Sequence, residues 1–339
     1  MLGRALGFSD PEVIRILKES FIPVVGDDWY QRRRNDEIGK FFRSVVDQTW
    51  KAGKWGNNGG DNRQGIYCFT PSGRMLTEMK NVGSHPAELR RLLQGAVAAW
   101  KRLPEEERRP GAVQVPDVAF DPGYHRPVPP GAIVLRQYQR GLKRAADGSL
   151  AAHDFSFREA PVWAQRDRAW VLENEWTALV PAAPSAPAVG AEVEIPAALK
   201  RRLLRYHVVE SLVGEPGVWP PESIRSEKLK LTIQEATPAA LRYQLEGSIL
   251  MTTEPDAAAS RCGLEGTVTG ILTYDRTKAA FDRFDVVVVA DCWGALNGHN
   301  PASREGRNPV GWALELGTGA DVDAVPPQGA RLLQAYLKP

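Results

Sequence analysis

Apolar residues recur at helical spacing in the first third of the chain and alternate with polar residues in the last third. The stretches 11–21, 38–50 and 89–100 each repeat an apolar side chain every three or four positions, which predicts three amphipathic helices. The first is preceded by Ser9-Asp10-Pro11, which supplies a capping side chain and then proline at the first helical position. The apolar run at 21–25 predicts a short strand after that helix.

A hairpin is predicted between the second and third helices. The apolar runs 66–69 and 75–79 flank Thr70-Pro71-Ser72-Gly73, where proline presets φ and glycine tolerates a positive φ. Ser84 stands where it can cap the last helix. Residues 1–109 are therefore interpreted as one α/β domain.

The second half of the chain predicts an antiparallel β domain. Period-two alternation favours strands at 229–233, 241–253, 264–274, 281–293 and 310–316, joined by short polar turns. Because no helix separates them, a β-sandwich or a partly open barrel is expected. A helix from Pro196 and a terminal helix at 328–337 flank these strands, so the β domain spans 191–339. Residues 110–190, rich in proline, are interpreted as a linker with connecting elements, including a strand at 132–142.

The amino-acid composition limits the classes of binding partner to be expected. The chain has 339 residues with 43 Lys and Arg against 41 Asp and Glu, a balance that does not favour nucleic acid or an anionic membrane. No apolar run approaches the roughly 20 residues that span a bilayer. Cys68, Cys262 and Cys292 form no close pair in sequence, which indicates a reducing compartment and predicts a cytoplasmic protein. No cofactor is predicted, and the oligomeric state is left open.

Residues 8–100 resemble the thioredoxin-like superfamily, most closely its members related to the spermatogenesis-associated proteins. The resemblance rests on the helix start at 9–13, the strand-like run at 21–25, the acidic pair at 27–28 and the turn at 69–73. It implies a thioredoxin fold for this part, which is under a third of the chain. No family resemblance is identified for residues 190–339.

The chain departs from that superfamily at its redox site. A Cys-x-x-Cys pair belongs at the start of the helix near Pro11, where the helix dipole lowers a thiol pKa, and residues 1–8 contain no cysteine. Gln64 stands where thioredoxins carry a cis-proline. The expected function is therefore a protein- or peptide-binding scaffold without the redox dithiol. Its groove would bind an extended peptide through main-chain hydrogen bonds, and ordinary loop packing is the competing interpretation. The residues expected to line the groove are Trp55, Asn57, Asn58, Arg63 and Gln64.

The missing first strand leaves two alternatives open. Either the natural protein begins upstream of Met1 and contains that strand with its thiol, which would make it a thiol-disulfide oxidoreductase, or another segment, 132–142 or 168–172, fills the gap in the sheet.

A second candidate site lies at the end of the most apolar strand. Asp291 and Cys292 precede a polar loop that contains His299. Cys292 and His299 form a candidate nucleophile and base, or two ligands of a metal site together with Asp291 and His207. His207 and Glu210, three apart on one helix face, form another metal candidate. The competing interpretation of each is packing or a solvated loop, since neither spacing is a known signature.

Overall fold

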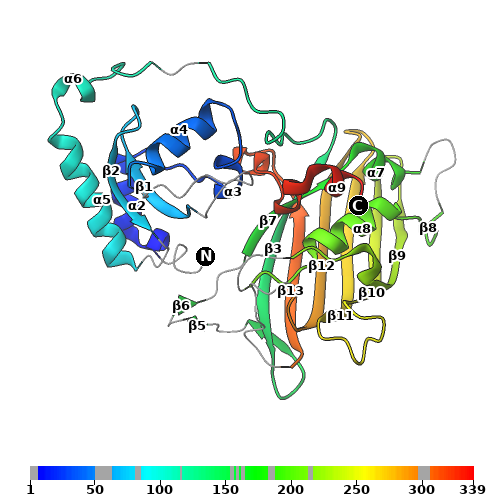
Figure 1. Ribbon diagram of the computed structural model, residues 1–339. Coiled ribbons are helices and arrows are strands. Elements are labelled where there is room, and N and C mark those ends of the chain that lie inside the picture. Colours follow the sequence, from blue (N-terminus) through cyan, green and yellow to red (C-terminus); the bar gives the residue numbers. More distant parts are fainter. Residues whose placement is uncertain are drawn as a thin grey trace. The chain divides into compact units, whose positions relative to one another are not determined.

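The computed structural model divides the chain into two compact units, which we describe separately. Unit 1 comprises Met1–His125 with Phe157–Ala160, and unit 2 comprises Arg126–Ser156 with Pro161–Pro339 (Figure 1). The residues described are 7–49, 63–80, 85–114, 117–152, 156–157, 160–161, 165–181, 188–212, 217–296 and 306–339.

Unit 1 is built from helices around one hairpin. Asp10 caps the first helix, since its Oδ1 accepts hydrogen bonds from the amides of Glu12 (3.1 Å) and Val13 (3.0 Å), and Pro11 begins it as predicted. Ser84 lies outside the described residues, and His85 is the cap of the last long helix. The elements are α2 (Pro11–Ser20), α3 (Asp28–Gln31), α4 (Glu37–Val46), β1 (Gly65–Phe69), β2 (Met75–Lys80), α5 (Pro86–Lys101) and α6 (Glu105–Arg108).

The predicted hairpin is confirmed. Strands β1 and β2 pair antiparallel with Ile66 opposite Met79, and Gly73 adopts a φ of 86° in the turn. One face of the hairpin packs on α2 and α5, where Cys68 is buried with Val13 and Leu89. The other face meets α4. There the rings of Phe41 and Phe69 lie 5.6 Å apart.

The strand expected at 21–25 is not formed. Phe21 is extended (φ −136°, ψ 158°) and packs against the core of unit 1. Among the described residues, however, β1 and β2 pair only with each other, so no ladder includes residues 21–25. The prediction was wrong because an extended apolar segment becomes a strand only when a neighbouring backbone pairs with it.

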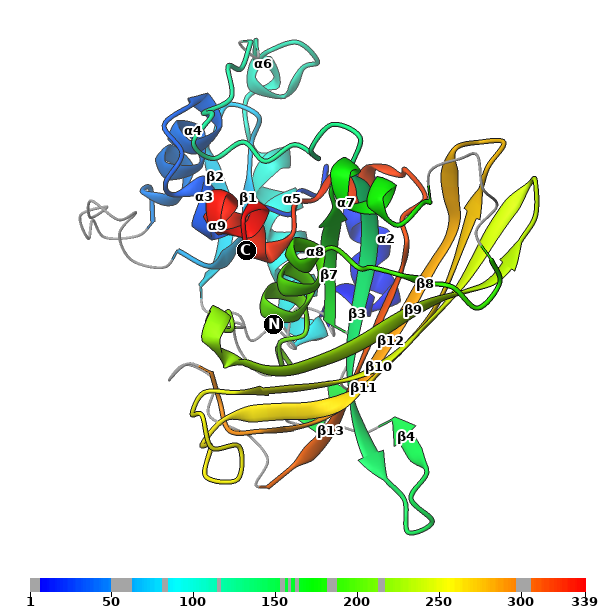
Figure 2. The ribbon, with the colours of Figure 1, turned by 90° about the vertical axis from the view of Figure 1, so that its right-hand side faces the viewer.

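Unit 2 is organised by one nine-stranded sheet. Its strand order is β4-β3-β13-β12-β11-β10-β9-β8, with β7 also paired to β3, and every pairing is antiparallel. Figure 2 shows the long strands bending, with α8 against them. The strands are β3 (Ile133–Arg144), β4 (Leu150–Ala152), β7 (Gln165–Val171), β8 (Glu192–Val193), β9 (Ile224–Ala236), β10 (Ala240–Thr252), β11 (Gly263–Asp275), β12 (Ala280–Trp293) and β13 (Asn308–Leu316). Outside this sheet, β5 (Ser156–Phe157) pairs with β6 (Ala160–Pro161).

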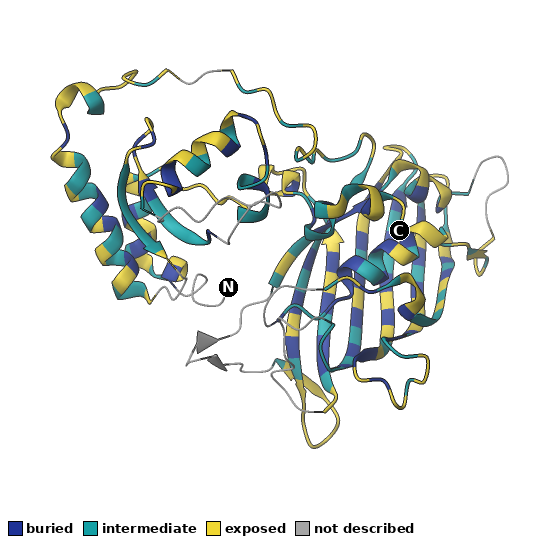
Figure 3. Cartoon of the chain, viewed as in Figure 1, coloured by how far each residue is buried: buried dark blue, intermediate teal, exposed yellow. Residues whose placement is uncertain are grey.

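The predicted period-two strands are confirmed, but they form a single sheet. Buried residues alternate with intermediate or exposed ones along them (Figure 3), and Leu241, Tyr243 and Leu245 are the buried set in the first half of β10. Their inner face packs on Leu199, Leu204 and neighbouring residues of the helical segment. A second sheet is therefore not needed to bury this face, and the β-sandwich alternative does not describe the unit. Segments 132–142 and 168–172 lie largely in β3 and β7, where they belong to this sheet rather than to the hairpin of unit 1.

The helical segments of unit 2 contribute side chains to its core. The helix predicted from Pro196 begins as α8 and continues into one π-helical turn, η1. Arg202 of α8 is fully buried and donates to the carbonyls of Tyr336 (2.8 Å) and Leu337 (3.0 Å), so it fastens the C-terminal helix. The helical elements are α7 (Glu173–Ala178), α8 (Ala197–Arg202), η1 (Leu203–His207), η2 (Pro221–Ser223), η3 (Asp321–Ala324), η4 (Gln328–Leu332) and α9 (Leu333–Leu337).

Candidate functional site

Unit 1 exposes an apolar segment that is held at both ends. We call residues 22–25 the open segment. Ile22, Val24 and Val25 are 91%, 82% and 101% exposed. Before the segment, Phe21 packs into the core; after it, the carboxylate of Asp27 accepts a 2.8 Å hydrogen bond from the amide of Trp29. Apolar side chains presented this fully to solvent are a mark of an interaction surface.

The backbone of the open segment favours pairing along one edge. In a strand, residues 22 and 24 direct their N–H and C=O groups to one side, and residues 23 and 25 direct theirs to the other. Pro23 has no N–H, which removes a donor from the second side. Ile22 and Val24 keep both groups. The edge that they form is therefore the better one for accepting another strand.

The five residues predicted to line a peptide-binding groove are not shown to form one surface. Trp55, Asn57 and Asn58 lie outside the described residues. Arg63 is only 2% exposed, and its carbonyl accepts a 2.5 Å hydrogen bond from the Tyr67 hydroxyl, so its side chain does not present an open surface. Gln64 is half-buried immediately before β1.

The structure separates Asp291 from Cys292. Successive residues of a strand face opposite sides of the sheet. Asp291 turns to one side and pairs with Arg144 at 2.9 Å, whereas Cys292 turns to the other and is buried opposite Leu264. His299 lies outside the described residues. The described part of the proposed cluster is therefore not one site.

His207 belongs to a buried polar cluster that holds the C-terminal helix. The side chain is 1% exposed, and its Nε2 lies 2.8 Å from the hydroxyl of Tyr336. That hydroxyl also accepts from the amide of Trp170 at 3.2 Å, and Asp167 lies 3.7 Å from Nδ1 of the histidine. Burial raises the pKa of Tyr336 far above its ordinary value. Among the residues that the structure describes, no group of three or more His, Cys, Asp or Glu side chains is arranged to hold a metal ion.

Glu210 lines a recess in unit 2 together with both cysteines of that unit. The recess is open to solvent and has an empty volume of about 380 Å³, which counts the open part. The two cysteines stand 30 positions apart in sequence, and the β11–β12 register brings them together. No local signal in the sequence marks this meeting of the two cysteines, because it depends on how β12 pairs with β11. Its lining consists of Glu210, Gly217, Trp219, Cys262, Gly263, Leu264, Cys292, Trp293, Gly294, Ala295 and Leu296.

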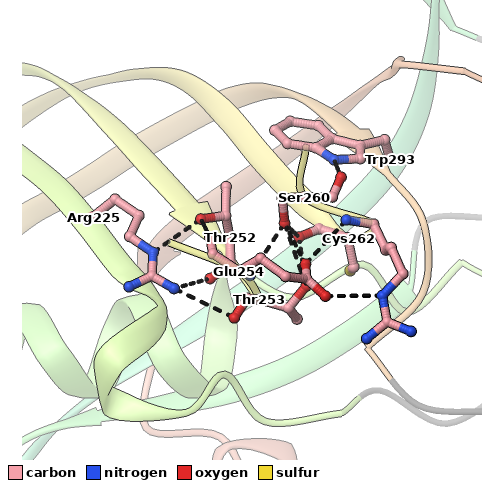
Figure 4. A network of polar contacts seen from close by, with 8 residues as sticks. Arg225, Thr252, Thr253, Glu254, Ser260, Cys262 and Trp293 are labelled. Carbon is pink, nitrogen blue, oxygen red and sulfur yellow. Dashed lines mark hydrogen bonds and ion pairs between the residues drawn. The ribbon is translucent and has the colours of Figure 1, made fainter. Parts of the chain in front are cut away.

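A network of polar contacts fixes the loop beside this recess (Figure 4). The carboxylate of Glu254 accepts hydrogen bonds from Thr253 (2.5 Å), Ser260 (2.8 Å) and both the amide (3.0 Å) and the guanidinium (2.9 Å) of Arg261. The hydrogen bond from Thr253, followed by those from Arg261 and Ser260, lowers the pKa of Glu254 to about 2. Trp293 donates from Nε1 to the Ser260 carbonyl at 2.9 Å, which ties the loop to the end of β12.

The thiol of Cys262 is kept protonated by its surroundings. Burial, and then the negative charges of Glu254 and Glu210, raise its pKa to about 11. A thiol with such a pKa is a poor nucleophile at neutral pH, because the thiolate is the reactive form.

Comparison with known proteins does not identify a family. No protein-family model, curated protein or solved structure matches the chain. In the described residues, no helix combines the length and apolar character that crossing a membrane requires. The case for a function therefore rests on the geometry.

Proposed function

We propose that this protein is a binding scaffold whose unit 1 captures an extended segment of another polypeptide by strand addition. The observation that carries the proposal is the open segment, where Ile22, Val24 and Val25 are almost fully exposed between two anchored ends. Strand addition gives affinity through main-chain hydrogen bonds and specificity through alternate side chains. The partner class is therefore an extended peptide with apolar side chains at alternate positions.

The arrangement of unit 1 supports a thioredoxin-like relationship as part of the same proposal. An antiparallel hairpin leads into α5. On one face of the hairpin, α2 and α5 contribute to the core, and on the other face an aromatic ring of α4 contacts a ring of β1. Such a domain binds extended partners beside its sheet, which agrees with a segment directly after α2 that no strand of the described residues pairs with. Cys68 is buried in the core, and burial raises the pKa of its thiol, which favours binding over thiol chemistry at that position.

The test uses the full-length chain and a phage-displayed library of random decapeptides. Selected peptides should alternate β-branched or aromatic residues with polar ones, and a synthetic copy should bind in a fluorescence-anisotropy titration. Val24→Pro should abolish that binding because it removes the amide at the edge able to pair.

Val25→Pro is the matched control. It changes the same side-chain type in the same exposed segment, but the lost amide lies on the other edge, where Pro23 already lacks one. It should retain binding within a few fold. Equal losses for Val24→Pro and Val25→Pro, or selection of no peptide, would contradict strand addition at this edge. Circular dichroism verifies that both variants remain folded.

A further inference from the structure

We propose that residues 120–125, which we call the strap, hold the peptide-binding edge of unit 1 in position, and that Asp121 is the positioning residue. This inference rests on the proposed function, because it concerns the same open segment. The strap and the open segment both belong to unit 1. They are far apart in sequence, and their connection runs through α3.

The second anchor of the open segment is the start of α3. The carboxylate of Asp27 accepts a hydrogen bond from the amide of Trp29 at 2.8 Å. The carbonyl of Asp27 accepts from the amides of Tyr30 and Gln31, each at 3.0 Å, and Tyr30 is buried. The end of the open segment therefore moves only as far as α3 moves.

The strap is fastened to the connection between α3 and α4. Oδ2 of Asp121 accepts a hydrogen bond from the amide of Asn35 at 2.8 Å, and the amide of Asp121 donates to Oδ2 of Asp36 at 2.8 Å. Asp36 is itself fixed, since it accepts from Nε of the buried Arg34 at 2.7 Å and caps α4 through the amide of Gly39 at 3.1 Å. One residue of the strap thus makes two hydrogen bonds to a connection that lies about 85 positions earlier.

Aromatic rings attach the strap to α3 itself. The ring of Tyr124 lies 5.8 Å from the ring of Trp29, and Phe120 stacks on His125 at 4.5 Å. The amides of Tyr124 and His125 both donate to the carbonyl of Asp121, at 2.9 and 2.8 Å. This turn fixes Tyr124 relative to Asp121, so the carboxylate and the ring hold α3 together.

A second restraint on α3 acts at its other end. Nη1 of Arg43, on α4, donates to the carbonyl of Arg34 at 2.8 Å and lies 3.4 Å from the carbonyls of Gln31 and Arg32. Tyr124 instead contacts Trp29, whose amide donates to Asp27. The strap therefore acts at the end of α3 that carries the open segment.

A positioned edge binds an extended peptide more tightly than a mobile one. Strand addition requires the open segment to adopt one conformation, and ordering it on binding costs conformational entropy. The docked strap removes part of this cost before the peptide arrives. By linkage, a bound peptide must stabilise the docked strap by the same factor. For residues that do not touch the ligand, such factors are roughly 2- to 30-fold.

The experiment is a fluorescence-anisotropy titration of the full-length chain with a selected decapeptide. Asp121→Ala should weaken peptide binding by roughly 2- to 30-fold. Asp121→Asn keeps one side-chain oxygen that can accept from the Asn35 amide, so it should restore part of the affinity. Affinity equal to that of the native chain in Asp121→Ala would overturn this inference and leave strand addition standing.

Two control variants separate positioning from general stability. Asp117 is an exposed carboxylate earlier on the same segment, with no hydrogen-bond or ion-pair partner among the described residues, so Asp117→Ala should bind the peptide normally. Leu93→Val trims the core of unit 1 on α5. It should lower the free energy of unfolding and leave the affinity unchanged while the folded fraction stays near one. An affinity loss in Leu93→Val equal to that in Asp121→Ala would overturn the positioning role.

A reciprocal measurement uses the native chain and does not depend on any variant folding. The hydrogen bonds of the Asn35 and Asp121 amides exist only while the strap is docked. Their hydrogen exchange, resolved by NMR, should slow on peptide binding by a factor close to the affinity loss of Asp121→Ala. Unchanged exchange of both amides with the peptide bound would overturn this inference alone. Absence of peptide binding to the native chain would overturn the proposed function and this inference with it.

Discussion

The most sharply defined energetic prediction concerns the buried ion pair between Glu175 and Arg202. The two side chains are 2% and 0% exposed, and Nη1 of the arginine lies 2.5 Å from Oε2 of the glutamate. The same carboxylate oxygen accepts from the amide of Leu172 at 2.9 Å. The other two hydrogen bonds of Arg202 go to the carbonyls of Tyr336 and Leu337, and its guanidinium lies 5.5 Å from the centroid of the Tyr336 ring. Among the described residues, Glu175 is therefore the only negatively charged hydrogen-bond partner of this guanidinium.

Glu175→Ala removes that charge and leaves the arginine buried among neutral carbonyls. Breaking a buried pair in this way costs about 3–5 kcal/mol, and a cost near 4 kcal/mol lowers the folding equilibrium constant roughly 1,000-fold. The double variant Glu175→Leu, Arg202→Met should recover much of the loss, because replacing both charges by apolar groups of similar volume is often neutral.

Hydrogen exchange of β11 and β12 peptides reports on unit 2 alone and is the appropriate assay. Glu192→Ala is the control, since its 2.7 Å pair with Lys230 is 64% and 57% exposed and is expected to contribute about 0.2–1 kcal/mol. Equal, small effects of Glu175→Ala and Glu192→Ala would refute the reasoning. So would a double variant less stable than Glu175→Ala.

Two further predictions concern the recess and its loop. Gly263→Ala should displace the Trp293 ring, destabilise unit 2 by about 1–3 kcal/mol and shift tryptophan emission. Gly311→Ala should destabilise unit 2 less, because the atom nearest to the added Cβ, at 3.2 Å, is the end of a flexible side chain. Equal destabilisation by the two variants would contradict this prediction. The pKa of Glu254 is lowered from about 4.5 to about 2, chiefly by the hydrogen bond from Thr253. Its carboxylate should therefore stabilise the loop above about pH 4.5, and this stabilisation should be lost as the pH falls toward 2. Hydrogen exchange of the loop should accelerate over this range in the native chain and not in Glu254→Gln.

Local pattern was sufficient for the elements that carry their own signals. Asp10 and Pro11 marked a helix start that the structure confirms, and the turn around Pro71 and Gly73 marked the hairpin. Apolar and polar residues alternate along the long strands of unit 2, so this two-residue period was enough to predict that these segments are strands. In each case the determining interactions lie within a few residues.

Features that depend on a distant partner could not be predicted in the same way. The run 21–25 has strand composition, but pairing requires another backbone, and none pairs with it among the described residues. Asp291 and Cys292 are adjacent in sequence yet face opposite sides of β12, while Cys262 and Cys292 share one recess. Only the register of β11 against β12 decides which side chains meet.

The central claim is that the open segment receives a strand along the edge formed by Ile22 and Val24. The most direct measurement is amide hydrogen exchange, resolved by NMR, with and without a selected decapeptide. Strand addition predicts strong protection of the Val24 amide on binding and little change at Val25. Protection of both amides alike, or of neither while the peptide is bound, would contradict the claim.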